Sequence, residues 1–334
     1  MIRVGIVGSG FMGSTHAEAY TKLSGVEIVG FVGKGEERRK ALAAKYSTGH
    51  FGLLRDLLAH KPDIVDICLP SYLNREAVEA ATGAGAHVLV EKPIALSLED
   101  ADAIVESARR NSVKLMVAHV LRFWPEYVKI RELLTAGDLG EPLTASAIRA
   151  GAGAPPGTKS WGTDFSRSGG VSANMNIHDF DICNWLFGKA LRVYATATEH
   201  HGGGWFDMNA IITYEHGVSV SIKASSMMAG PYPFTMGLRV QGTAATVEYF
   251  FQSQSNVRHL AQARREFNLF REDGTAAALP TLTWDPYVAE LEYFVRCVRE
   301  NREPESGTGE QARLALAIAL ACNRSAEEGR VIEL

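Results

Sequence analysis

A glycine-rich turn near the start of the chain has the spacing that suits a bound phosphate. The pattern G-x-G-x-x-G occupies residues 8–13, directly after the β-branched run Ile2–Val7 and before the helical segment 14–20. In such a turn the first glycine permits a tight bend, the second lets the backbone approach a pyrophosphate, and the third lets the helix pack closely on the strand. The helix N-terminus then presents N–H groups to the anion. This context predicts a dinucleotide site, whose contacts we expect to be Gly8, Gly10, Phe11, Met12 and Gly13.

A lysine follows the predicted strand 87–90, in the tripeptide Glu-Lys-Pro at residues 91–93. Ligands of open α/β sheets bind beyond the carboxyl ends of the strands. Lys92 is therefore expected to reach the place of a nicotinamide ring and to hydrogen-bond a reacting hydroxyl group. The alternative is a solvated lysine in a loop, but the position directly after a strand favours the functional interpretation.

A polar stripe is predicted on a helix that follows the glycine turn at residues 169–170. Asn174, His178 and Asp181 are spaced i, i+4 and i+7, so on an α-helix they share one face. An amide, an imidazole and a carboxylate suit a site that orients a hydroxyl group and accepts its proton. The alternative is a histidine that Asp181 or Asn174 holds in the packing between domains.

The first third of the chain alternates short apolar runs with helical segments. Helices are expected at 14–20, Glu36–Tyr46 and 73–82, and another begins after Ser97 with an S-x-x-D capping box. The expected strands are Ile2–Val7, Val26–Val32, 64–69, 87–90 and 114–118. Such alternation implies right-handed crossovers and a doubly wound parallel sheet. Residues 1–121 are therefore predicted to be an α/β Rossmann domain that binds a dinucleotide.

After about residue 121 the pattern changes to that of an α+β domain. A helix is expected at 124–135, a strand at 143–150 and a buried helix at 309–326. Between them, strands follow one another without helices, at 192–198, 210–214, 218–224, 238–241 and 246–250. This order favours a large, mostly antiparallel sheet, so residues 122–334 are predicted to bind substrate and to oligomerise. The exposed face of the sheet would pack on another subunit of a homodimer or homotetramer.

The composition excludes several classes of protein. The net charge of −4 provides no basic field for a nucleic acid or an anionic membrane. The chain contains no apolar stretch of the ~18 residues that a membrane helix requires. Its four cysteines are scattered without a C-x-x-C pair, which favours the reducing cytoplasm and argues against a structural metal site.

Taken together, these segments resemble the Gfo/Idh/MocA family of sugar and cyclitol oxidoreductases. The resemblance extends over nearly the whole chain. It includes the run VAHVLRF at 117–123, Trp161 ahead of the Gly-Gly turn, and the closing helix that begins GEQ at 309–311. It implies that a hydride passes between NAD(P) and a secondary hydroxyl or ketone group of a sugar, a cyclitol or a sugar derivative.

The resemblance also implies a catalytic pair and two contacts on the cofactor side, namely Lys92, His178, Pro70 and Glu91. Two positions depart from the family pattern. Asn174 stands where members commonly carry Asp, and an amide supplies no negative charge to raise the basicity of His178. We keep Asn174 in the catalytic site as a hydrogen-bonding partner of a substrate hydroxyl. Asn74 stands where many members place a histidine and is expected to contact the ribose or the amide of the cofactor.

The end of the second strand bears on the choice of cofactor. An acidic residue about 20 residues past the glycine pattern would pair with the ribose hydroxyls of NAD. Here the strand ends at Gly33, and Lys34 and Arg38 follow. The absence of a carboxylate at the strand tip favours NADP over NAD. The alternative is that Lys34 and Arg38 are surface charges and that a nearby glutamate reaches the ribose.

Candidate substrate contacts lie near the junction between the predicted domains. They are Arg122, Lys159, Trp161 and Asp181, beside Lys92, Asn174 and His178. The alternatives are a structural salt bridge for Arg122 and a core position for Trp161. Two other functions stay open at this point: a transhydrogenase that keeps NADP bound while it exchanges hydride between two carbohydrates, and a non-catalytic NAD(P)-binding regulator.

Overall fold

The chain folds into two compact units. The computed structural model describes residues 1–152, 160–199, 204–257 and 263–334. The first unit contains Met1–Phe123 and Trp284–Arg313, and the second contains Trp124–Thr283 and Leu314–Leu334. The sequence suggested a single boundary between residues 121 and 122, whereas residues 284–313 belong to the first unit and the chain then re-enters the second, whose sheet gains its last strand at Ile332–Glu333. None of the described helices is long and apolar enough to cross a membrane.

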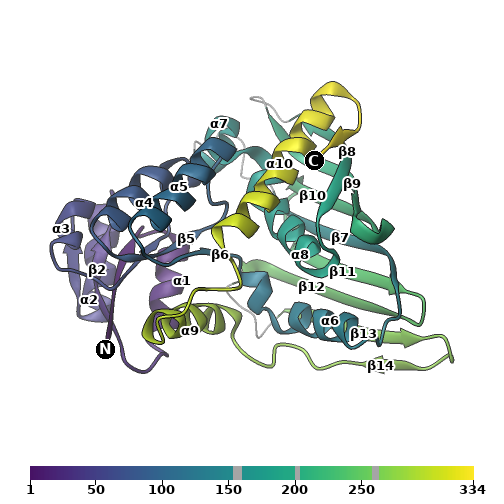
Figure 1. The fold of residues 1–334 in the computed structure, drawn as a ribbon, viewed down its shortest axis with the longest axis horizontal. Coiled ribbons are helices and arrows are strands. Elements are labelled where there is room, and N and C mark those ends of the chain that lie inside the picture. The colour runs from purple at the N-terminus through teal and green to yellow at the C-terminus, as the bar shows by residue number, and fades with distance from the viewer. Residues whose placement is uncertain (153–159, 200–203, 258–262) are drawn as a thin grey trace. The chain divides into compact units, whose positions relative to one another are not determined.

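A parallel sheet forms the centre of the first unit, as the alternating pattern predicted (Figure 1). Its six described strands lie in the order β3-β2-β1-β4-β5-β6, and each neighbouring pair is parallel. The strands are β1 (Ile2–Val7), β2 (Val26–Val32), β3 (Gly49–Phe51), β4 (Ile64–Ile67), β5 (His87–Glu91) and β6 (Leu115–Ala118). Strands β4, β5 and β6 are almost wholly buried, which explains why their sequences are mainly apolar; Asp66 of β4 is a buried exception.

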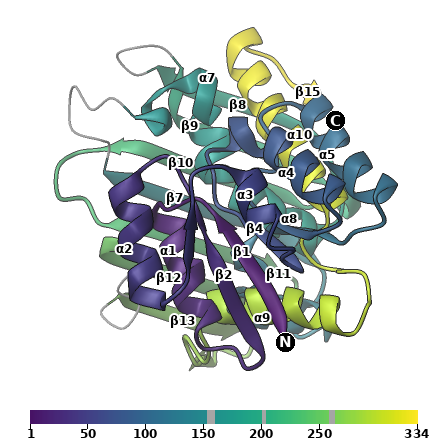
Figure 2. The same ribbon diagram turned by 90° about the vertical axis from the view of Figure 1, so that its left-hand side faces the viewer.

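Helices cover both faces of this sheet (Figure 2). Those that precede β6 are α1 (Phe11–Tyr20), α2 (Glu36–Tyr46), α3 (Leu54–Leu58), α4 (Asn74–Gly83) and α5 (Leu98–Arg110). Helices α4 and α5 pack beside each other on one face, and α1 lies on the other. Helix α9 (Pro286–Arg299) packs against α1, so the segment that returns from the second sheet completes the cover of the first. Short 3₁₀ turns, Ser71–Leu73 and Val120–Phe123, follow β4 and β6.

The second unit is built on a larger, mostly antiparallel sheet, again as predicted. Its nine described strands lie in the order β14-β13-β12-β11-β7-β10-β9-β8-β15. They are β7 (Pro142–Ala152), β8 (Ala190–Glu199), β9 (Trp205–Tyr214), β10 (Ser219–Met228), β11 (Phe234–Gly242), β12 (Ala245–Val257), β13 (Arg264–Arg271), β14 (Ala276–Ala278) and β15 (Ile332–Glu333). The pair β7 and β10 is parallel.

One face of this second sheet is covered by helices and the other is open. Inward side chains such as Val220, Ile222 and Val247 are buried, and α6 (Pro125–Thr135), α8 (Ile177–Phe187) and the C-terminal part of α10 (Gly309–Glu328) lie over that face (Figure 1). Outward residues alternate with them, as the period of two in a β-strand requires. Ile211 on β9, which points outward, is 55% exposed.

Candidate active site

Close backbone packing at two positions explains the glycines of the turn between β1 and α1. Gly8 has a φ of +126° and donates its N–H to the carbonyl oxygen of Val32, at 2.7 Å. A Cβ atom at Gly8 would collide with the carbonyl oxygen of Cys68, and one at Gly13 would collide with that of Gly8. A side chain at either position would therefore push the helix away from the strands.

The N-terminus of α1 is open to an anion. Gly10 is its N-cap, no described side chain caps it, and the first turn contains no acidic residue. A Cβ atom at Gly10 would meet nothing within 4 Å. The N–H groups of the first turn, where Phe11 and Met12 are half-buried, therefore have open space before them and the positive end of the helix dipole behind them. These residues fit the pyrophosphate of a dinucleotide.

Three basic residues follow the end of β2: Lys34 in the loop, and Arg38 and Arg39 at the start of α2. Only Arg39 is turned inward. Lys34 and Arg38 are exposed, as expected for residues that meet a ligand from solvent. Arg39 is buried, and its guanidinium group donates to the carbonyl oxygen of Gly33. A Cβ atom at Gly33 would lie 2.7 Å from Ser9 Oγ, so this tip is packed closely on the glycine turn. The sequence did not distinguish Arg39 from its neighbours, because only the fold shows which arginine points inward.

Three central strands end side by side at the edge that carries the glycine turn. The residues that pair in register across β1, β4 and β5 are Val7, Ile67 and Val90. Pro70 follows β4 and Lys92 follows β5, and both are half-buried. The glycine turn, Pro70 and Lys92 therefore lie at one carboxyl edge of the sheet, where open α/β folds bind their ligands.

Asn74, which was predicted to contact the cofactor, makes three hydrogen bonds within the first unit. Its side chain is fully buried at the start of α4. Its Nδ2 donates to the carbonyl oxygens of Glu91, Pro93 and Ile94, at 3.3, 3.1 and 3.2 Å. A buried amide with three backbone acceptors shapes the turn that carries Lys92, and its burial keeps it from a ligand in solvent.

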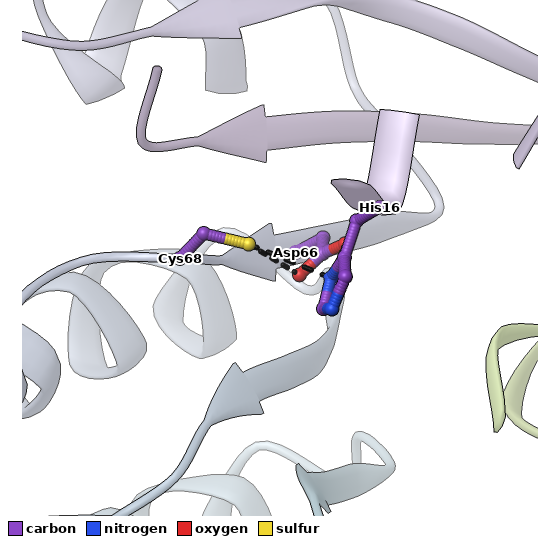
Figure 3. Close-up of side chains that lie close together, drawn as sticks. All are labelled: His16, Asp66 and Cys68. Atoms are coloured by element: carbon purple, nitrogen blue, oxygen red, sulfur yellow. Dashed lines mark hydrogen bonds and ion pairs between the residues drawn. The ribbon is translucent and has the colours of Figure 1, made fainter. Parts of the chain in front are cut away.

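Glu91, which the resemblance placed on the cofactor side, is buried and contacts groups of the first unit. Its Oε2 accepts a hydrogen bond from the Lys92 N–H at 3.1 Å. Its Oε1 lies 3.3 Å from Nε2 of His16, which is fully buried on α1. His16 Nδ1 lies 2.8 Å from Asp66 Oδ2 on β4, and the Cys68 thiol donates to Asp66 Oδ1 at 3.4 Å. Figure 3 shows the side chains of His16, Asp66 and Cys68 pointing toward one another.

His16, Asp66 and Cys68 have the ligand types of a transition-metal site, and their ligand atoms lie within 4.8 Å of one another. However, each of these atoms already has a partner within the cluster. Burial, followed by the charge of Asp66, also raises the pKa of the Cys68 thiol far above its ordinary value. A neutral thiol is a poor metal ligand, so the contacts favour a hydrogen-bonded cluster.

In the second unit, the expected single helix begins with a π-helical turn. Residues Ser172–Asn176 form this turn and α8 continues from it. Asn174 therefore lies on the π turn, whereas His178 and Asp181 lie on α8, so the α-helical spacing that predicted one shared face does not apply to Asn174. Asn174 and His178 are half-buried and Asp181 is buried. A π turn inside a helix frequently marks a functional site.

A buried ion pair fixes the first turn of α8 to the sheet. Arg149 on β7 donates from Nε and Nη2 to the two carboxylate oxygens of Asp179, each at 2.9 Å. Both side chains are buried. Desolvation opposes the charge on Arg149, but Asp179 outweighs it and raises the pKa of the guanidinium group. We did not predict this pair, although an arginine at an inward position of β7, in line with Ala145 and Ala147, signals a buried acidic partner.

The remaining substrate candidates are divided between the units. Arg122 is buried on a 3₁₀ turn of the first unit. Trp161, in the turn Trp161–Thr163 of the second unit, is 39% exposed, so it is not a core residue. Lys159 lies outside the described residues. The first unit thus brings together the glycine turn, Pro70 and Lys92, and the second brings together Asn174, His178 and Asp181 on neighbouring turns.

Comparisons with known proteins agree with this division. Residues 2–119 match the family described as "Oxidoreductase family, NAD-binding Rossmann fold", and residues 127–248 match the GFO/IDH/MocA C-terminal domain. Scyllo-inositol 2-dehydrogenase (NAD(+)) of Bacillus subtilis is 26% identical, over 100% of this chain and 96% of its own length. Myo-inositol 2-dehydrogenase of Thermotoga maritima is 25% identical, over 100% and 98%.

A solved structure shows the same likeness in three dimensions. UDP-N-acetylglucosamine 3-dehydrogenase of Acidithiobacillus ferrooxidans is 25% identical and superimposes with a TM-score of 0.81, over 98% of each chain. Both units, and not the dinucleotide-binding fold alone, therefore have counterparts in this group of proteins. The chain belongs to the Gfo/Idh/MocA family of oxidoreductases, whose N-terminal domain has an NAD-binding Rossmann fold.

Proposed function

We propose that the protein transfers hydride reversibly between NAD(P) and a secondary alcohol of a sugar, a cyclitol or a sugar derivative. The observation that carries this proposal is the position of Lys92, which follows β5 at the carboxyl edge that also holds the open glycine turn. The names of the relatives, which are inositol and sugar dehydrogenases, support the class of substrate. The four cysteines are free thiols, which suits the cytoplasmic location that we also propose.

We propose the following roles for the residues of the chain. The N–H groups of the first turn of α1 bind the pyrophosphate of the cofactor, whose nicotinamide, when bound, accepts or donates the hydride. Lys92 holds and polarises the substrate oxygen with its ammonium group. His178 takes the hydroxyl proton on its imidazole, and Asn174 orients the substrate by a hydrogen bond. Arg122, Trp161, Asp181 and Lys159 are proposed contacts to the rest of the substrate.

Replacement of Lys92 tests the central assignment. In Lys92→Met, a chain of similar length replaces the ammonium group, so turnover should fall by roughly 10²–10⁴-fold, the usual contribution of a positioned acid–base group. The dissociation constant of the cofactor should stay within about threefold, because the α1 N-terminus is unchanged. Steady-state reduction of NAD and NADP with a panel of sugars and inositols measures the first quantity, and fluorescence titration measures the second. Lys45→Met, on the exposed side of α2, is the matched control. Normal turnover in Lys92→Met would refute the assignment.

A change at Asn174 tests whether His178 is the base. Asn174→Asp places a carboxylate near the imidazole and should raise the apparent pKa of the base by roughly one unit. Because the base acts when unprotonated, the rising limb of the pH–rate profile should move to higher pH by the same amount. Asn301→Asp, at an exposed position just after α9 (Pro286–Arg299), introduces the same charge elsewhere and should leave the limb in place. An unmoved limb in Asn174→Asp contradicts the proposed contact with His178.

We further propose that NADP is preferred over NAD, because β2 ends without a carboxylate and the exposed cations Lys34 and Arg38 follow it. Glu36 and Glu37, in the first turn of α2, are the carboxylates that would favour NAD instead. Removing both cations in Lys34→Ala/Arg38→Ala should weaken NADP binding by roughly tenfold or more, the equivalent of one charged hydrogen bond. NAD lacks the 2′-phosphate, so its dissociation constant should change little. Isothermal titration with both cofactors measures the difference, with Lys45→Ala as control. Equal weakening for the two cofactors would show that these residues do not recognise the phosphate.

We propose that the open face of the second sheet packs against a second copy of the chain, in a homodimer or homotetramer. A hollow of about 630 Å³ lies on this face and is lined by outward residues of β7, β9, β10, β11 and β12, among them Ile148, Ile211 and Phe250. These apolar side chains lie among neutral polar residues such as Ser221 and charged ones such as Lys223 and Glu248. Covering them would remove apolar surface from water, which favours association.

A charge on this face should prevent the association. In Ile211→Asp, a carboxylate would be buried without a partner at the interface, and the protein should sediment as a monomer with unchanged secondary structure. Leu53→Asp is the control, because Leu53 is exposed at the N-cap of α3, where Asp is well tolerated. Analytical ultracentrifugation reports both results. If Ile211→Asp has the same mass as the unchanged protein, this face is not the interface.

A further inference from the structure

A histidine outside the proposed catalytic pair is enclosed between two carboxylates. His16 is 0% exposed, and its two ring nitrogens face different acids. Nδ1 lies 2.8 Å from Asp66 Oδ2, and Nε2 lies 3.3 Å from Glu91 Oε1. Asp66 belongs to β4 and Glu91 ends β5, so the histidine of α1 is set against two neighbouring strands. A ring with an acid at each nitrogen is most stable as the imidazolium, in which both nitrogens carry protons.

The other titratable groups around His16 are neutral or acidic. Cys68 lies beside Nδ1, Tyr20 comes from α1 itself, and Tyr287 and Glu290 come from α9. Burial and the nearby acids raise the pKa of both phenols and of the thiol well above their ordinary values. Desolvation is the largest single effect on His16 and opposes its charge, but Asp66 and Cys68 together outweigh it and raise the pKa of the imidazole.

Glu91 connects His16 to the turn that holds Lys92. One carboxylate oxygen faces His16, and the other accepts the Lys92 N–H. Asn74 holds the carbonyl oxygens of Glu91, Pro93 and Ile94 from the other side. Without the imidazolium, Glu91 and Asp66 would be two like charges in a buried site, and Glu91 would lose the cation that holds it in its present position. A displaced Glu91 is a weaker acceptor for the Lys92 N–H.

We propose that His16, held between the carboxylates of Asp66 and Glu91, is a positioning residue that fixes the backbone of Lys92 for action on the substrate. This inference rests on the proposed role of Lys92. His16 touches neither cofactor nor substrate in this proposal. It acts through Glu91, and its charge is the property that matters.

Nuclear magnetic resonance of the protein labelled with ¹⁵N-histidine tests the charge without reference to catalysis. The His16 signals, assigned by their loss in His16→Gln, should show both ring nitrogens protonated at pH 7.5, where an ordinary histidine is mostly neutral. Asp66→Asn should move the titration of His16 to lower pH, because it removes the nearer acid. A neutral His16 at pH 7.5 in the unchanged protein would overturn the proposal.

Kinetics test the positioning. His16→Gln keeps a hydrogen-bonding side chain but removes the charge, so kcat should fall by roughly tenfold to a hundredfold, as for a misplaced catalytic group. The dissociation constant of NADP should change by less than about threefold. Ser107→Ala is the matched control, because it breaks a buried hydrogen bond to Thr82, of 2.8 Å, in the same unit. If kcat of His16→Gln equals that of Ser107→Ala, His16 has no positioning role.

A pH profile keeps the test decisive where His16→Gln fails to fold. In Asp66→Asn, the protonated and active form of His16 is lost as the pH rises through its lowered pKa. The kcat profile should therefore gain a falling limb at alkaline pH that the unchanged protein lacks, at the pH of the titration seen by resonance. The absence of that limb overturns the proposal. Lys92→Met distinguishes the proposed function from the proposed charge of His16. If this variant retains turnover, the proposed function fails, while the resonance measurement of the charge on His16 still stands.

Discussion

The alignment of the carboxyl ends of β1, β4 and β5 is the constraint on which the first unit depends. Because these strands stop in register, the glycine turn, Pro70 and Lys92 reach the same edge without any long loop. The glycines make that edge compact, since a side chain at Gly8 or Gly13 would strike a neighbouring carbonyl group. The edge thus combines an open helix N-terminus, which attracts an anion, with a lysine held on a short turn. This is the arrangement that a dinucleotide and a hydroxyl substrate require together.

Beneath this edge the protein maintains a buried cluster of charges at a substantial cost of desolvation. Asp66 and Glu91 lie close to a site that must accept an anionic cofactor, and they would repel it if they were not neutralised. His16 neutralises part of their charge from within α1, the same helix whose N-terminus is open to the phosphate. Helix α1 therefore presents its positive N-terminal end at one turn and, in the proposal above, a positive imidazole ring to the two acids at another.

Local patterns in the sequence predicted most of the fold, and contacts between distant segments account for what they missed. The helix Glu36–Tyr46 and the strands Ile2–Val7 and Val26–Val32 have the predicted bounds, because periodicity and flanking glycines define them. The strand Gly49–Phe51 and the helix Leu54–Leu58 are too short to show a period. Helix α9 was not predicted, although Asp285 followed by Pro286 is a helix-start signal and Asp285 does cap it. The inward role of Asn74 depends on three carbonyl groups that lie 17 to 20 residues away in the chain, which no local pattern reports.

The two candidate catalytic side chains, Lys92 and His178, share one feature: the residue beside each of them in sequence is a buried acid. Lys92 is preceded by Glu91 and His178 is followed by Asp179, and each of these acids is buried against a basic partner from another element. His16 of α1 faces the first acid, and Arg149 of β7 binds the second through two hydrogen bonds. A side chain that acts on a substrate must be held in its productive geometry by the groups around it. A buried acid one residue away contributes to this, because it ties the adjacent backbone to the core. The sequence suggested the lysine and the histidine as candidates by their chemistry, whereas the basic partners of the neighbouring acids became visible only in the fold.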